Sequence, residues 1–121
     1  MYDYKATLVR VVDGDTVYLK VDLGFHTEQT HCFRLNGVDT PELHSKDVAE
    51  KKLAAEAMSF VESEFMKRAN RCRVYSEKTG SFGRWLGDIY FIDEIGRRIS
   101  LREMLIDRGY GKPYKGRGRD A

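Results

Sequence analysis

Three short segments of the chain gather residues that could carry out chemistry. They are residues 13–16 (DGDT), residues 33–42 (FRLNGVDTPE) and residues 82–84 (FGR). The middle segment ends in Asp39, a stiff Thr-Pro pair and Glu42, so one rigid corner presents two carboxylates. Alone, the DGDT segment is typical of a turn. A lone Gly-Arg pair indicates nothing specific, so the interest lies in the combination.

A cation site is the first chemistry that these segments suggest. Asp15 and Asp39 are expected at the ends of strands two apart in an antiparallel meander, so their carboxylates could converge. Oxygen ligands with no cysteine nearby select a hard cation such as Ca²⁺ or Mg²⁺. His44 is close in sequence, but a histidine in a loop is more often a solvated side chain.

The elements that must position these residues begin with three strands. The first ends at the turn over residues 13–15, and the second, over 17–23, alternates apolar and polar residues with a period of two. A polar hairpin loop is expected over 24–30, and a third strand over 32–38. Pro41 then breaks regular structure.

Two helices and two more strands are predicted after Pro41. Apolar residues recur every three to four positions in a helix that begins between residues 48 and 54 and ends near Arg68. Strands follow over 71–76 and 84–92. A capping box over residues 100–103 opens a second helix, which Gly109 ends.

This order predicts an α+β protein, a five-stranded Greek-key OB-fold β-barrel with two helices, which is a common platform for nucleic acids. From the pattern alone, other small α+β folds compete. The 121 residues fit one domain, expected over residues 1–110 and followed by a basic, Gly-rich tail over 111–121.

Charge is distributed unevenly along the chain. Residues 1–66 carry 7 Lys/Arg and 12 Asp/Glu, a balance of −5, and residues 67–121 carry 14 and 7, a balance of +7. This suits a cation site beside a polyanion surface, and it also suits a protein with only solvated charged faces. No apolar run approaches the ~20 residues of a membrane span. No signal-peptide pattern opens the chain, so a cytoplasmic protein is expected, or a secreted one if an upstream signal has been removed.

Two cysteines, Cys32 and Cys72, make neither a disulfide framework nor a zinc site. They are expected as small buried apolar residues, and one disulfide between strands stays open as an alternative.

Taken together, in this order and at these intervals, the three segments resemble those of the staphylococcal nuclease (thermonuclease) family. The likeness covers roughly residues 5–110 and includes the spacing from Glu42 to Phe60 and the helix before Gly109. The resemblance implies an OB-fold phosphodiesterase that is calcium-dependent and sugar-nonspecific. Such an enzyme cleaves DNA and RNA and leaves 3′-phosphate and 5′-hydroxyl ends.

The resemblance also implies roles for particular residues. The catalytic residues would be Arg34, Glu42 and Arg84, and the calcium ligands would be the carboxylates of Asp15 and Asp39 and the backbone carbonyl of Thr40. Physically this is coherent: guanidinium groups clamp an anionic phosphodiester, and a carboxylate orients or deprotonates the attacking water.

The chain departs from the family's prototype around the substrate. Phe82 stands where the prototype has a tyrosine, so a ring can stack but not donate a hydrogen bond, and Ser81 stands in place of a lysine. The chain after Gly109 is too short for the prototype's last helix. The candidate substrate-binding residues are Phe82, Tyr110, Lys112, Tyr114 and Lys115.

The expected partner is therefore a nucleic-acid substrate, acted on by a monomer away from membranes. One rival interpretation is a non-catalytic OB-fold module that binds single-stranded nucleic acid. A second is a metal-binding structural protein, which the basic C-terminal half disfavours.

Overall fold

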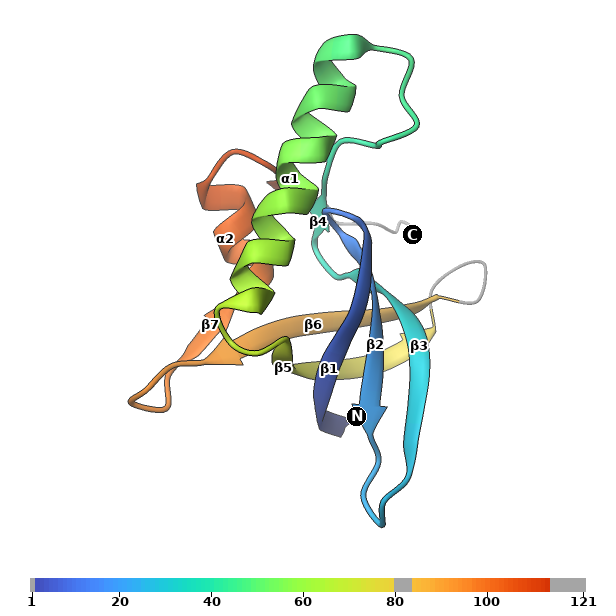
Figure 1. The fold of residues 1–121 in the computed structure, drawn as a ribbon, viewed down its shortest axis with the longest axis vertical. Helices are drawn as coiled ribbons and strands as arrows, with labels where there is room; N and C mark the ends of the chain where they lie inside the picture. The colour runs from blue at the N-terminus through green and yellow to red at the C-terminus, as the bar shows by residue number, and fades with distance from the viewer. Residues whose placement is uncertain (1, 80–83, 114–121) are drawn as a thin grey trace.

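The computed structural model describes residues 2–79 and 84–113, and its main element is a curved sheet (Figure 1). The sheet order is β3-β2-β1-β5-β6-β7, and β3 also pairs in parallel with β6. That pairing joins the two ends of the run β3-β2-β1-β5-β6 and so closes a five-stranded barrel, as the sequence predicted. The strands are β1 (Tyr2–Asp13), β2 (Thr16–Asp22), β3 (Glu28–Leu35), β5 (Arg71–Thr79), β6 (Trp85–Ile92) and β7 (Arg98–Ser100).

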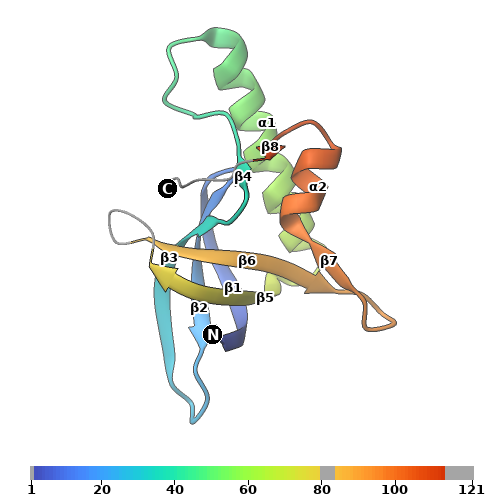
Figure 2. The same cartoon turned by 180° about the vertical axis from the view of Figure 1, so that it is seen from behind.

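Both helices lie at the same end of the barrel, and a β2–β3 hairpin extends from the other (Figures 1 and 2). Helix α1 (Val48–Met66) begins at Asp47, whose carboxylate accepts hydrogen bonds from Ala49 N and Glu50 N. Helix α2 (Leu101–Asp107) begins at Ser100, whose hydroxyl accepts from Glu103 N. Neither helix is long and apolar enough to cross a membrane, within the residues described.

The core fills the barrel and the space beneath α1. Its completely buried side chains alternate along the strands and recur along the helices, as the sequence pattern predicted. The largest of them are Leu19, Leu35, Phe65, Ile89, Phe91, Leu101 and Leu105. Phe65 of α1 meets Phe91 of β6 edge to face, with ring centroids 5.1 Å apart.

An ion-pair cluster closes the C-terminal end of α1, and we call it the helix-end cluster: Glu64, Lys67 and Arg68. Lys67 Nζ lies 2.8 Å from Glu64 Oε2, and Arg68 Nη1 lies 3.1 Å from Glu64 Oε1. Arg68 Nη1 also donates to the Glu64 carbonyl oxygen at 2.7 Å, and its guanidinium covers the Phe91 ring. The buried carboxylate is thus held by two cations.

The structure corrects the third predicted strand at both ends. Strand β3 begins at Glu28 rather than near residue 32, because the β2–β3 ladder continues to the pair Asp22–Glu28, beyond the apolar core. It ends at Leu35, where a turn through Gly37, with φ +81°, starts a new strand. This strand, β4 (Val38–Asp39), pairs with β8 (Lys112–Pro113) in a separate sheet.

Three short elements were not predicted: β4, β7 and β8. Each has two or three residues, too few to show a period. The two cysteines, Cys32 on β3 and Cys72 on β5, are free thiols, and no disulfide joins them.

Candidate active site

The predicted site residues meet at the corner between the β1–β2 turn and the β3–β4 turn. Arg34 lies at its centre, with Nη1 2.8 Å from Asp15 Oδ2 and Nη2 3.2 Å from Asp39 Oδ1. We call these three residues the site cluster. The guanidinium and Asp15 are largely buried, whereas the Asp39 side chain is 60% exposed. The convergence of Asp15 and Asp39 expected from the meander is present.

Local backbone structure explains why Asp15 occupies this place. Thr16 pairs with Arg34 across the β2–β3 ladder, and Leu35 N donates to the Asp15 carbonyl oxygen at 2.8 Å. The Asp15 carboxylate accepts hydrogen bonds from the Thr16 hydroxyl, 2.9 Å, and from Thr40 N, 3.0 Å. Asp15 therefore ties the first turn of the barrel to the corner that follows β4.

Gly14 allows this turn to approach α1 closely. A Cβ at this position would lie 3.0 Å from the Ala57 Cβ and 3.1 Å from the Thr40 hydroxyl. Thr40 is buried, and its Oγ1 has no hydrogen-bond partner among the described residues. Its side chain thus packs between the turn and the helix, while its backbone N–H serves Asp15.

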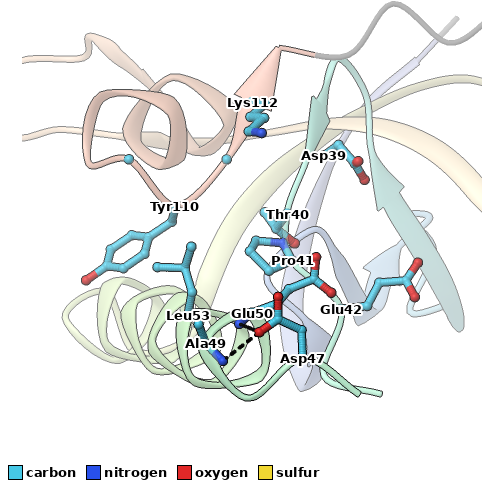
Figure 3. A pocket seen from close by; sticks show the side chains of 12 residues that line it. Asp39, Thr40, Pro41, Glu42, Asp47, Ala49, Glu50, Leu53, Tyr110 and Lys112 are labelled. Atoms are coloured by element: carbon cyan, nitrogen blue, oxygen red, sulfur yellow. Dashed lines mark hydrogen bonds between the residues drawn. The ribbon is translucent and has the colours of Figure 1, made fainter. Parts of the chain in front are cut away.

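Glu42 and Asp39 face a cavity of about 640 Å³ between the corner and the helices (Figure 3). Asp39, Thr40, Pro41 and Glu42 form one wall. The first turns of α1 contribute Asp47, Ala49, Glu50 and Leu53, and the segment from Gly109 to Lys112 completes the lining. Figure 3 shows Tyr110 and Glu42 on opposite sides of this cavity. The cavity lining includes five of the predicted site residues: Asp39, Thr40, Glu42, Tyr110 and Lys112.

Lys112 reaches this site through the unpredicted β4–β8 pairing. Asp39 and Lys112 are direct partners in that ladder, which places opposite charges side by side on neighbouring strands. Tyr110 is fixed by a different contact, because its ring packs on Phe60 of α1 with centroids 5.3 Å apart. Phe82, Tyr114 and Lys115 lie outside the described residues.

Arg84 lies on the outer barrel face rather than in the cavity. It immediately precedes β6, where Trp85 pairs with Phe33, so it is level with Cys32 and shares a face with Arg34. Burial raises the pKa of the Cys32 thiol, and the positive charge of Arg84 is the strongest influence opposing it. The two predicted catalytic arginines thus lie close together along one edge, next to the corner that bears Glu42.

Asp13 belongs to the same site, although the sequence analysis gave it no role. Burial raises the pKa of its carboxyl, the N–H of Leu43 opposes this, and the charges of Asp15 and Glu42 raise it further. His44, exposed as expected, lowers it. The signal for Asp13 was its place as the first residue of DGDT, which a turn alone explains.

The two aspartates of the site cluster are the candidate ligands of a metal ion. Asp15 and Asp39 offer only oxygen atoms, which fits a hard cation such as Ca²⁺. Within residues 2–79 and 84–113, no group of three or more His, Cys, Asp or Glu side chains is arranged to hold a metal ion. Asp15 and Asp39 are thus two carboxylates that share Arg34, and a cation bound here would need further oxygen ligands from the backbone, water or substrate.

Comparison with known proteins gives a family. Residues 32–120 match the model of the staphylococcal nuclease homologues, a range that begins inside β3 and includes Arg34, Glu42 and Arg84. An uncharacterized protein of Methanocaldococcus jannaschii is 31% identical over 129 residues, which is 92% of this chain and 59% of that protein. The endonuclease YhcR of Bacillus subtilis is 32% identical over 120 residues, 93% of this chain and 9% of that protein. The chain thus spans less than two thirds of either relative.

Proposed function

The chain belongs to the staphylococcal nuclease family, and on this premise we propose that it hydrolyses phosphodiester bonds of nucleic acids. The observation that supports this most directly is the site cluster, in which one guanidinium joins the buried Asp15 to the exposed Asp39 beside Glu42. We further propose that the enzyme is calcium-dependent, acts on both DNA and RNA, and leaves 3′-phosphate and 5′-hydroxyl ends.

Arg34 and Arg84 bind the scissile phosphate. Both lie on the face of β3 and β6 opposite Phe33, and Arg34 is fixed by two carboxylates before substrate arrives. Guanidinium groups donate paired N–H bonds to phosphate oxygens, and these bonds strengthen as negative charge grows in the transition state. Such preorganised donors lower the barrier without reorganisation during the reaction.

Glu42 orients and deprotonates the attacking water. Its carboxylate is exposed at the cavity wall, so it can reach water that enters the cavity. Tyr110 and Lys112, across the cavity or beside Asp39, are in place to contact substrate groups next to the scissile bond. Phe82, Tyr114 and Lys115 stay candidates for substrate binding.

Ca²⁺ would be held by the carboxylates of Asp15 and Asp39 and the carbonyl oxygen of Thr40. When bound, it supplies positive charge that neutralises the phosphate and its transition state. The carboxylates of Asp13 and Glu42 add to the negative potential around Asp15, because the charges of Asp15 and Glu42 both raise the pKa of Asp13.

The test is hydrolysis of end-labelled single-stranded DNA and RNA by wild type and Glu42→Gln, with Ca²⁺ or with a chelator. Glu94→Gln is the matched control, because Glu94 is an exposed glutamate in the β6–β7 turn. Products should carry 5′-hydroxyl ends, which accept phosphate from a polynucleotide kinase without prior dephosphorylation. Binding with no cleavage by wild type in Ca²⁺ would instead establish the non-catalytic nucleic-acid-binding module.

A further inference from the structure

A row of side chains crosses the outer barrel face beyond the site cluster. Arg10 on β1 pairs with Tyr18 on β2, and Tyr18 pairs with Cys32 on β3. Arg84, just before β6, is level with Cys32. One register position therefore joins four adjacent strands, with an arginine at each end of the row.

Arg10 is held in this row by an aromatic ring. Its guanidinium carbon lies 4.3 Å from the centroid of Tyr18, a cation–π contact. The Tyr18 side chain is hydrogen-bonded to Cys32, and the charges of both Arg84 and Arg10 act on the same thiol. Tyr18 is therefore held by its hydrogen bond to Cys32, and its ring orients the guanidinium of Arg10.

The charge of Arg10 contacts an aromatic ring rather than a carboxylate. Arg10 is exposed, and no carboxylate among the side chains that the structure describes forms an ion pair with it. Lys20, the next cation along the same face of β2, is by contrast 3.8 Å from Glu28. A preoriented guanidinium without an acidic partner is a site for an anion from outside the protein.

The position of Arg10 relative to the proposed catalytic arginines makes a phosphate of the substrate strand the candidate anion. Neighbouring strands are about 4.8 Å apart, so the path from Arg10 to Arg84 along the curved barrel surface crosses three strand spacings and measures roughly 14 Å. A nucleic-acid strand whose scissile phosphate lies at Arg34 and Arg84 would carry another phosphate over Arg10 a few nucleotides away.

We propose that Arg10, oriented by Tyr18, forms a further phosphate-binding subsite that holds the substrate strand a few nucleotides from the scissile bond. The proposal rests on the proposed function, because it extends the same substrate across β3, β2 and β1. Arg10 contributes to binding of long substrates and takes no part in bond cleavage.

The test compares Arg10→Gln with Arg97→Gln, which removes the same charge from the β6–β7 turn, where Arg97 pairs with Asp93. On a single-stranded oligonucleotide long enough to cover the row, Arg10→Gln should raise KM several-fold with kcat unchanged. The slope of log affinity against log salt should become shallower by ~0.7. On a dinucleotide, which is too short to reach Arg10, KM should not change.

Variants of Tyr18 separate positioning from general electrostatics. Tyr18→Leu removes the ring without changing charge and should raise KM on the long substrate, as Arg10→Gln does. Tyr18→Phe keeps the ring and should restore KM toward the wild-type value. A Tyr18→Leu protein with wild-type KM would overturn the positioning role.

Equal effects of Arg10→Gln and Arg97→Gln, or equal effects on long and short substrates, would overturn the subsite. If wild type binds nucleic acid but does not cleave it, the proposed function fails and the subsite remains testable. Fluorescence anisotropy with a labelled single-stranded oligonucleotide then decides: weaker binding by Arg10→Gln than by Arg97→Gln supports the subsite, and equal binding overturns it.

Discussion

The site cluster and the helix-end cluster contain opposite ratios of cations to carboxylates. In the site cluster one cation is shared by two carboxylates, and in the helix-end cluster one carboxylate is shared by two cations. The shared carboxylate of the helix-end cluster, Glu64, is 5% exposed, and one of its two cations, Lys67, extends toward solvent. In the site cluster the shared guanidinium is largely buried, and a carboxylate extends toward solvent.

The difference separates a structural cluster from a functional one. The charge of Glu64 is saturated by partners three and four residues away, at the C-terminal end of α1, so folding alone satisfies it. The site cluster retains excess negative charge, and Asp13 and Glu42 increase it. Lys112 beside Asp39 offsets part of this charge, and the proposed function assigns neutralisation of the remainder to a bound cation.

The largest predicted effect is on catalysis. Glu42→Gln and Arg84→Ala should each lower kcat by ~10²–10⁴, because each removes a group that acts on the reacting atoms. Thermal unfolding of Glu42→Gln should be unchanged, since this exposed side chain lies outside the core. Lys67→Gln in the helix-end cluster should keep wild-type kcat. Wild-type turnover by Glu42→Gln, in protein free of contaminating nuclease, would refute the role assigned to Glu42.

The second prediction concerns the excess charge of the site cluster. Ca²⁺ should raise the melting temperature of wild type, because a ligand that binds only the folded state contributes about 2.7 kcal/mol at a hundred times its Kd. Asp39→Asn should abolish most of this rise and leave the melting temperature in chelator unchanged. Glu103→Gln, which alters an exposed glutamate of α2, is the control.

Activity should follow the same pattern: it should require Ca²⁺ and be poor with Mg²⁺ alone. A site with a small number of protein ligands suits the flexible coordination of Ca²⁺ better than the strict octahedral coordination of Mg²⁺. A calcium-induced rise in the melting temperature of Asp39→Asn equal to that of wild type would show that the cation binds elsewhere.

The sequence analysis did not name the helix-end cluster and named the site cluster only in part, for different physical reasons. The separations of three and four residues in the helix-end cluster are helical spacings, so the contact follows from the helix itself. The site cluster needs Asp15, Arg34 and Asp39 to be joined by the barrel, and the meander predicted that the two aspartates converge. It did not predict that Arg34 would lie between them, because the resemblance gave this arginine the role of binding the substrate phosphate.

The placement of Lys112 shows the limit of such reasoning. Its pairing with Asp39 joins residues far apart in the chain through two strands of two residues each, which leave no periodic signal. By contrast, the strand over 17–23 and the helix ending near Arg68 were predicted correctly, because each is long enough to show its period.

The third prediction concerns Glu64 and the stability that its ion pairs contribute. Burial raises the pKa of Glu64, but its hydrogen bonds to Lys67 and Arg68 outweigh this and hold the pKa below its usual value. Glu64→Gln should therefore lower the free energy of unfolding by about 1–3 kcal/mol at neutral pH. Because the folded-state pKa is depressed, this stabilisation is present above the ordinary glutamate pKa and is lost as pH falls through the folded-state value.

The measurement is urea unfolding of Glu64→Gln and wild type across that pH range, with Glu62→Gln, an exposed neighbour on α1, as control. The difference between Glu64→Gln and wild type should shrink in acid. A difference that is constant with pH would mean that the loss comes from packing and not from charge.

The smallest predicted effect is that of the exposed member of the helix-end cluster. Lys67→Gln should lower the free energy of unfolding by less than about 0.5 kcal/mol, because the Lys67 side chain is 62% exposed and such pairs are screened by water. Arg68 continues to hold the Glu64 carboxylate, and its guanidinium remains over Phe91. The small loss should diminish further in high salt. A salt-independent loss above about 2 kcal/mol, as large as that of a buried pair, would show that Glu64 is not saturated by Arg68 and that the contrast between the two clusters is wrong.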